Sequence, residues 1–210
     1  MTWHPGYLDQ QVGTFLDELA AGTPAPAGGS AAALVIAQAA ALCAKAARLS
    51  ARQLTAERAD QLTAQAERIR TTAASLIDED ARGYRGVIEA IRRTARPGDA
   101  AAPSGSAPNP GGQAANPGEL AEALSRAAEV PMRLVELATP VAELAATLAA
   151  EGNPALHGDV LTAALLAQAG ARAATALISI NLAAAPHDTR PGRAVRLLAE
   201  IAGSVDRATG

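Results

Sequence analysis

Three consecutive acidic residues in the segment IDEDARGY, residues 77–84, are the first candidates for chemistry. At helical periodicity Ile77 and Tyr84 share an apolar face, Asp80 lies at the edge of that face, and Asp78 points away from it. A carboxylate at such an edge loses hydration unless it is paired or used. Asp80 is therefore either the partner of an arginine or a helix end, or an acid/base group whose raised pKa suits taking a proton from water.

A second candidate is the segment PAPAGGSAAA, residues 24–33, which places two glycines and a serine before an alanine-rich run. Glycines let backbone N–H groups face an incoming oxygen or anion, and Ser30 can cap a helix by accepting an N–H bond. The alternative is a close crossing of two helices at Gly28 and Gly29. The segment is thus a ligand-contact candidate or a packing device.

Two polar residues flank the most apolar stretch of the chain. Asp159, in HGDVL, precedes this stretch and is either its N-cap or a functional carboxylate. Asn181, in SINL, lies near its end among apolar residues and needs a hydrogen-bond partner from protein or ligand.

The composition predicts an all-α protein, because alanine is abundant while aromatic residues make up only 2% of the 210-residue chain. The net charge of -3, without a basic block, argues against nucleic acid as a partner. Cys43 is the single cysteine, which excludes a disulfide framework and a cysteine-based zinc cage. The isolated histidines (His4, His157 and His187) do not indicate a metal site. The N-terminus has no export signal, so we expect a cytoplasmic protein.

Apolar spacing predicts a single domain over residues 1–210, built as an antiparallel bundle of long helices. The expected helices cover residues 8–21, 30–54, 56–94, a segment from 119, a segment started or kinked by Pro131 that runs to 150, 160–184 and 192–206. Residues 97–118, rich in Pro, Gly, Ser and Asn, are expected to form a mobile loop. The 160–184 helix is long enough to span a membrane, but its alanines, Gln168 and Arg172 favour a bundle centre or a dimer interface.

Four segments in order carry a family resemblance: FLDELAAGTPAPAGGSAAAL, DEDARGYRGVIEA, AAEVPMRLVELA and LAAEGNPALHGDVLTAALLAQAGARAATALISINL. Together they resemble the cyclodeaminase/cyclohydrolase family, which comprises the C-terminal domain of formiminotransferase-cyclodeaminase and stand-alone methenyltetrahydrofolate cyclohydrolases. The resemblance implies a dimerising helical bundle with tetrahydrofolate sites near the subunit interface. It also implies chemistry at the one-carbon bridge between N5 and N10, with the folate as substrate and neither a further cofactor nor a metal.

The resemblance implies two catalytic residues, Asp80 and Asp159, and five substrate-binding residues: Gly28, Gly29, Ser30, Tyr84 and Asn181. Because the chain has no room for a formiminotransferase domain, we expect hydrolysis of 5,10-methenyltetrahydrofolate to 10-formyltetrahydrofolate. The alternatives are release of ammonia from 5-formiminotetrahydrofolate and a helical dimer that binds folate without turnover. The last is favoured by two departures: the family's usual lysine-bearing turn reads RLSARQLTAER, and its Leu-Pro-Lys reads RRTARPGD. Lys45, where the family usually has an apolar residue, is either a relocated cation or a side chain that reaches solvent.

Overall fold

The computed structural model describes residues 6–94 and 117–210, which form helices and connecting turns without a strand. The elements are η1 (Tyr7–Asp9), α1 (Val12–Ala20), α2 (Gly28–Arg48), α3 (Ala56–Thr94), α4 (Pro117–Ala127), α5 (Glu129–Glu151), η2 (Pro154–Leu156), α6 (His157–Asn181) and α7 (Arg190–Thr209). The expected all-α class with long helices is confirmed. Of the predicted loop, residues 97–116 lie outside the described residues, and Pro117 and Gly118 instead begin α4.

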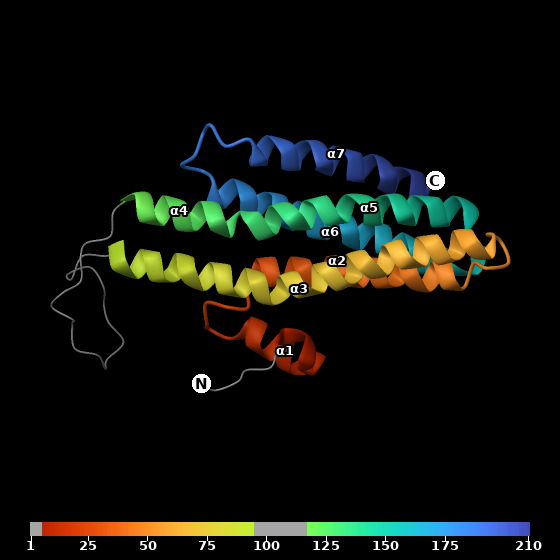
Figure 1. Cartoon of the computed structure of the whole chain (residues 1–210), viewed down its shortest axis with the longest axis horizontal. Coiled ribbons are helices and arrows are strands. Elements are labelled where there is room, and N and C mark those ends of the chain that lie inside the picture. The colour runs from red at the N-terminus through yellow and green to blue at the C-terminus, as the bar shows by residue number, and fades with distance from the viewer. Residues whose placement is uncertain (1–5, 95–116) are drawn as a thin grey trace.

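The long helices lie side by side in a bundle (Figure 1). The α2 helix packs against α3, α5 and α6, while α7 packs against α5 and α6. Short turns join α2 to α3 and α5 to α6, so consecutive helices run in opposite directions. The α1 helix lies below α3 in the view of Figure 1 and is attached to the bundle by Phe15, which is buried in the core. The connectivity thus places the start of α2 beside the end of α6.

Small side chains make up much of the core. Its largest fully buried members include Ile36, Leu76, Ile77, Leu134, Ile178 and Ile201, surrounded by buried alanines. Where α2 crosses α6, a Cβ added at Gly170 would lie 2.6 Å from Ile36 Cγ1. Alanine and glycine at the contacts therefore let these two helices approach more closely than larger side chains would.

Apolar residues recur at helical spacing along α3, at Leu62, Ile69, Ile77, Tyr84, Ile88 and Ile91, and this stripe is only partly buried. Leu62, Ile69 and Ile77 are buried, whereas Tyr84 and Ile91 are exposed. The reason is that α2 begins opposite Asp80, so the later turns of α3 lose α2 as a neighbour and bury only Val87 and Ala90, against α4. Other apolar residues at helical spacing are also exposed: Val12 and Leu16 on α1, and Val195 on α7.

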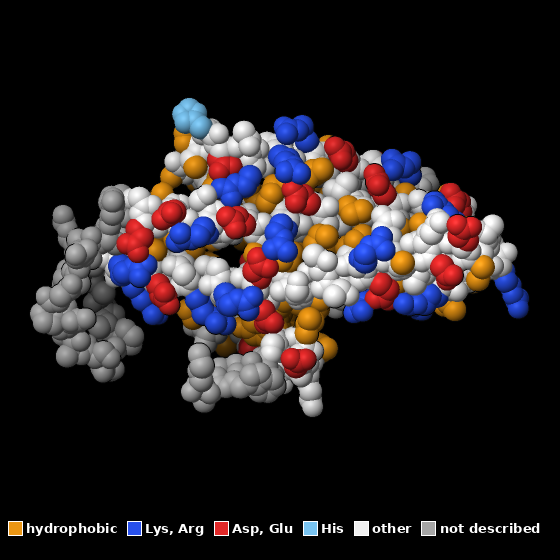
Figure 2. Space-filling model, in the orientation of Figure 1, with side chains coloured by type: hydrophobic (Ala, Val, Ile, Leu, Met, Phe, Trp, Pro, Cys, Tyr) orange, Lys and Arg blue, Asp and Glu red, His pale blue; other side chains and the backbone are white. Residues whose placement is uncertain are grey.

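Two helical segments, Gly28–Arg48 and Pro154–Asn181, are long and apolar enough to cross a membrane by length and composition. Core helices of soluble proteins pass the same test. The most apolar window of the first is 61% buried in the bundle, that of the second only 44%. The face over α3, α4 and α5, in contrast, carries interspersed Lys/Arg and Asp/Glu side chains (Figure 2). The α6 helix thus keeps an apolar side uncovered.

Candidate functional site

Asp80 on α3 faces the first turn of α2. The hydroxyl of Ser30 lies 3.1 Å from Asp80 Oδ2 and 3.0 Å from the carbonyl oxygen of Ile77. One hydroxyl carries one proton and can donate to only one of these acceptors at a time. When Asp80 is ionised the hydroxyl can donate to the carboxylate, and when Asp80 is protonated the carboxyl can donate to Ser30 while Ser30 donates to Ile77. Both charge states of Asp80 therefore find a hydrogen bond here.

The start of α2 has no side-chain cap of its own. Its first helical residue is Gly28, its N-cap is Ala27, and the predicted cap by Ser30 is wrong because Ser30 lies inside the first turn. A Cβ at Gly29 would overlap the Asp80 carboxyl group, so this glycine leaves the space that the carboxyl occupies. A carboxylate at a helix N-terminus also interacts favourably with the helix dipole. Asp80, which belongs to α3, thus takes the place of an N-cap side chain at the start of α2.

Burial raises the pKa of the Asp80 carboxyl above its ordinary value, and the hydroxyl and backbone N–H of Ser30 oppose this rise by stabilising the ionised form. A carboxyl group held between these two influences can both accept and return a proton. This is the electrostatic property expected of a general acid/base group, which is one of the two roles that the sequence allows for Asp80.

Asp80 borders a cavity of about 240 Å³ between α2, α3, α5 and the end of α6. The lining residues are Ala27, Gly28, Gly29, Asp80, Tyr84, Ala127, Pro131, Leu177, Ile180 and Asn181. Five of the predicted site residues, Gly28, Gly29, Asp80, Tyr84 and Asn181, are thus together. Ser30 is fully buried behind Asp80 and does not line the cavity, so within this chain it acts through the carboxyl group.

Asp159 lies at the opposite end of the chain's bundle. It occupies the first turn of α6 and is not its N-cap, because α6 begins at His157. Asn181 ends the same helix, which at 1.5 Å per residue places it roughly 33 Å from Asp159. Asp159 Oδ2 instead accepts from Lys45 Nζ at 2.7 Å, and both side chains are partly exposed. The structure therefore does not bring Asp159 to the Asp80 cavity within one chain.

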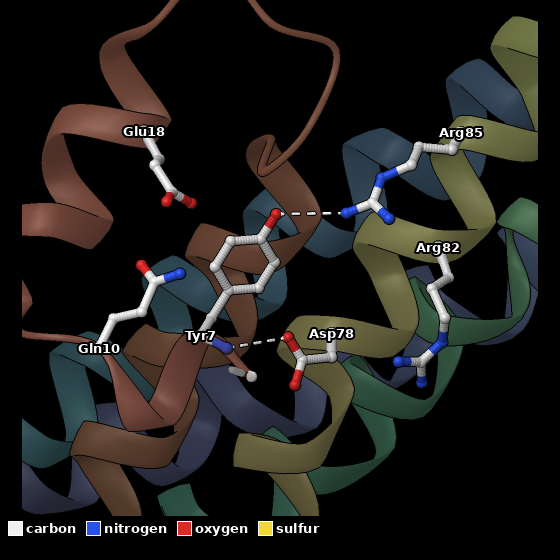
Figure 3. Close-up of a pocket in the computed structure, with 7 residues that line it drawn as sticks. Tyr7, Gln10, Glu18, Asp78, Arg82 and Arg85 are labelled. Atoms are coloured by element: carbon white, nitrogen blue, oxygen red, sulfur yellow. Dashed lines mark hydrogen bonds between the residues drawn. The ribbon is translucent and has the colours of Figure 1, made fainter. Parts of the chain in front are cut away.

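A second cavity, of about 510 Å³, lies between η1, α1 and α3 (Figure 3). Asp78 accepts from the backbone N–H of Tyr7 at 3.1 Å, and Arg85 lies 3.4 Å from the Tyr7 hydroxyl. Arg82 and Glu18 also point into this region. Sequence reasoning missed this cavity, although the arginine spacing of 82 and 85 on one helix was a signal. Its two arginines and two carboxylates balance in charge, and it does not contain Asp80.

Within the described parts of the chain, no group of three or more His, Cys, Asp or Glu side chains could hold a metal ion. The side chains around Asp80 and the start of α2 offer proton transfer and hydrogen bonding. Arg93, in the segment RRTARPGD that stands where the family has Leu-Pro-Lys, pairs with Glu119 away from the cavity, and Arg96 of the same segment lies outside the described residues.

Comparisons with known proteins agree with the family that the sequence resembles. A family model described as formiminotransferase-cyclodeaminase matches residues 11–192. Among solved structures, the chain is similar to formiminotetrahydrofolate cyclodeaminase from Thermotoga maritima, with a TM-score of 0.78 and 24% sequence identity. That alignment covers 96% of this chain and 94% of the other. At this identity the likeness is one of fold. No curated protein matches the chain significantly in sequence.

Proposed function

Because the chain belongs to the formiminotransferase-cyclodeaminase family, we propose that it hydrolyses 5,10-methenyltetrahydrofolate to 10-formyltetrahydrofolate, with Asp80 as the acid/base group. The observation that carries this proposal is the position of Asp80: a half-buried carboxyl group with a raised pKa on the wall of a cavity. Gly28, Gly29, Tyr84 and Asn181 on the same wall supply the substrate contacts.

The charge of the substrate fits this cavity. The one-carbon bridge of 5,10-methenyltetrahydrofolate is an amidinium-like cation, and the cavity lining contains one carboxyl group and no lysine or arginine. An ionised Asp80 attracts the cation, and the attraction is strengthened by partial exclusion of water. The amide of Asn181, which makes no hydrogen bond to the described protein, is available to a polar edge of the folate.

The reaction needs one proton acceptor at the bridge. A water oxygen bonds to the bridging carbon while one water proton passes to the Asp80 carboxylate, which gives a neutral hydroxyl adduct. The bond from this carbon to N5 then breaks: Asp80 returns its proton to N5, and the hydroxyl group loses its proton to water as the formyl C=O forms. Cation plus water thus gives the neutral formyl product and one released proton. Ser30 holds the carboxyl group in both of its charge states.

A second candidate is the release of ammonia from 5-formiminotetrahydrofolate, because the similar Thermotoga maritima structure bears the name of that activity. Expulsion of ammonia requires a proton donor to the departing nitrogen in addition to an acceptor for the N10 proton. In that reaction the single carboxyl group of the cavity lining would fill both roles in turn.

The proposal includes a homodimer. The uncovered side of α6 exposes Leu165 to 47% and Ile180 to 68%, and these apolar side chains lie on a helix with few charges. Contiguous apolar surface of this kind is typical of protein contacts. Ile180 also lines the Asp80 cavity, so the contact would border the site.

The test compares the unmutated protein with Asp80→Asn and with a matched control, Glu79→Gln. Asn keeps the size of Asp and a hydrogen-bonding group beside Ser30, but it cannot take a proton, so turnover should fall about a hundredfold or more. Glu79 is the preceding residue, and its carboxylate makes an exposed ion pair with Arg133, so the control should keep its activity. Loss of the methenyl absorbance is followed against a protein-free sample, beside an ammonia assay on the formimino substrate.

Equal rates for the three proteins would remove Asp80 from the mechanism. Ammonia release without loss of the methenyl absorbance would favour the cyclodeaminase. An unmutated protein that binds folate but turns over neither substrate would identify a non-catalytic binding dimer.

A further inference from the structure

The cavity between η1, α1 and α3, of about 510 Å³, lies on the side of α3 that faces away from Asp80. Asp78, Arg82 and Arg85 line it and lie within about 60° of one another around the helix, whereas Asp80 lies about 200° from Asp78. The volume of this cavity falls in the range of roughly 300–1,000 Å³ that is usual for small-molecule sites. The chain therefore has room for a ligand at a place that the Asp80 chemistry does not use.

Contacts within the chain hold one wall of this cavity in place. Tyr7 donates its backbone N–H to Asp78 Oδ1 at 3.1 Å, which ties η1 to α3. The ring of Tyr7 packs edge-on against Phe15, with 5.7 Å between the ring centroids, and Phe15 is buried in the core. Gly6 leaves room for the Asp78 carboxylate, because a Cβ there would lie 2.8 Å from Asp78 Oδ2. The cavity is therefore preformed, as small-molecule sites usually are.

Opposite charges line the cavity without pairing. Arg82 and Arg85 extend from α3, and the carboxylate of Glu18 extends from α1 on the other side (Figure 3). Within residues 6–94 and 117–210, none of these three side chains makes an ion pair, whereas Arg70 on the same α3 helix pairs with Glu67. The two guanidinium groups and the Glu18 carboxylate are thus available to opposite charges of a ligand.

Two neutral groups of the cavity also have hydrogen-bonding capacity to spare. The Tyr7 hydroxyl lies 3.4 Å from Arg85 Nη2, a long contact that a ligand oxygen can replace. Gln10 lines the cavity, and its Oε1 is buried with no hydrogen-bond partner in the described part of the chain. A buried acceptor without a donor is unfavourable, and an N–H group of a ligand would supply the donor.

The balance of charges selects the class of ligand. A simple anion is attracted by Arg82 and Arg85 but repelled by Asp78 and Glu18, and a simple cation experiences the reverse. A ligand that carries one charge of each sign satisfies both walls. Because the arginines and Glu18 belong to different helices, the two charges of the ligand should be several bonds apart, as in an ω-amino acid or a dipeptide.

We propose that this cavity binds a short linear zwitterion, with its carboxylate on Arg82 and Arg85 and its ammonium group on Glu18. The planar guanidinium group suits a carboxylate, to which it can donate two parallel hydrogen bonds. Asp78, whose Oδ1 already accepts from Tyr7, positions the wall. In a dipeptide, the peptide N–H between the charged ends is the kind of donor that Gln10 Oε1 lacks.

Isothermal titration calorimetry with four small probes tests the class of ligand. Glycylglycine and 5-aminopentanoate carry both charges, with the same number of bonds between the ammonium nitrogen and the carboxylate carbon. Pentanoate and pentylammonium carry one charge each. Both zwitterions should bind at least about tenfold more tightly than either singly charged probe, as expected for one additional charged hydrogen bond.

Zwitterions that do not bind, or that bind no more tightly than pentanoate, would overturn the proposal. Tighter binding of glycylglycine than of 5-aminopentanoate would identify a dipeptide as the ligand. Equal or weaker binding of glycylglycine would identify an ω-amino acid, recognised by its charges alone.

Matched variants test which residues hold each end of the ligand. Glu18→Gln removes the charge that faces the ammonium group, so its affinity for glycylglycine should fall at least about tenfold. Arg85→Met should weaken the zwitterions and pentanoate but not pentylammonium. The controls are Asp17→Asn on α1 and Arg68→Met on α3, exposed residues outside the cavity lining that should bind normally. If Glu18→Gln binds glycylglycine as well as Asp17→Asn does, the cavity does not hold the ammonium group and the proposal fails.

The Asp80→Asn variant tests whether this site is separate from the Asp80 cavity. It should bind glycylglycine like the unmutated protein, because Asp80 lies on the opposite side of α3. Loss of binding would place the zwitterion in the Asp80 cavity and refute the assignment. Thermal unfolding without ligand checks that every variant is folded. The measurement uses no folate, so its outcome does not depend on the proposed reaction.

Discussion

At the scale of single residues, the two interpretations open to Asp80 from the sequence are compatible. The carboxyl group is the partner of a helix end, and it lines a cavity. Periodicity could place Asp80 at the edge of an apolar face, because Asp80 and Ile77 share one helix. It could not predict the pairing of Lys45 with Asp159, which are 114 residues apart in sequence. Nor could it show that Ser30 acts through Asp80, since that depends on where α3 meets α2.

The pKa of Asp80 makes stability depend on pH in a defined direction. The raised pKa means that the folded state holds this proton more tightly than the unfolded chain. Asp80 therefore favours folding below its ordinary pKa, and this contribution is lost as pH rises through the raised value. Asp80→Asn has no such proton, so its free energy of unfolding relative to the unmutated protein should improve as the pH rises above about 4, the ordinary pKa of an aspartate. Urea unfolding at several pH values measures this, and a constant difference would contradict it.

Two adjacent glycines offer a matched pair of substitutions. In Gly29→Ala the new methyl group meets the Asp80 carboxyl group and must displace it from Ser30. Turnover should fall towards that of Asp80→Asn, with a stability loss of about 1–3 kcal/mol. In Gly28→Ala the nearest atom is Leu177 Cδ2, at 4.0 Å, so stability should be nearly unchanged. Thermal unfolding and the methenyl assay distinguish the two variants, and equal effects would show that the carboxyl group is not held against Gly29.

At the scale of elements, most helix ends could be predicted to within about four residues, because alanine favours helix throughout and most breaks contain proline or glycine. The helix expected over 30–54 is the exception: it ends at Arg48, and the turn that follows has neither proline nor glycine to mark it. Helical spacing aligns Tyr84 and Ile91 with the buried Ile77, yet both are exposed, because a periodic stripe does not show how far the neighbouring helix extends. The close approach of a neighbouring helix that the sequence offered as an alternative for Gly28 and Gly29 occurs at Gly29, against Asp80 of α3, and also at Gly170, against Ile36 of α2.

The crossing of α2 and α6 should be sensitive to added volume. Gly170→Ala introduces a Cβ at 2.6 Å from Ile36 Cγ1, and both sides are buried, so the helices must separate. We expect a loss of about 1–3 kcal/mol in the free energy of unfolding. The double variant Gly170→Ala/Ile36→Ala should be less destabilised than the sum of its two single changes, because the smaller side chain makes room. Simple additivity in urea unfolding would argue against this contact.

At the scale of the whole molecule, the α6 helix is buried on some sides and exposed to solvent on another. The sequence indicated a bundle centre or a dimer interface for the apolar helix over 160–184, and it could not indicate which of its residues stay exposed. The structure identifies Leu165 and Ile180 as exposed, at positions set by how α2, α5 and α7 pack around α6.

Assembly should therefore depend on these two side chains. We expect the unmutated protein to be a dimer by light scattering at micromolar concentration, and Leu165→Glu/Ile180→Glu to be a monomer because two carboxylates would face the partner's apolar stripe. Val195→Glu, an exposed apolar residue of α7, is the control and should remain a dimer. A monomeric unmutated protein, or a control that dissociates equally, would contradict the α6 interface.

The reactivity of the buried Cys43 thiol should report how often the helices around it separate. It is the single cysteine of the sequence, lies on α2 with its sulfur 3.8 Å from the carbonyl oxygen of Val141 on α5, and is fully buried. A thiol reagent can reach the Cys43 sulfur only when α2 and α5 separate. The labelling rate therefore measures this separation and not motion at the surface of the protein. Ligand-induced slowing of this rate would measure how far occupation of the Asp80 cavity tightens the distant centre of the bundle, without any introduced probe.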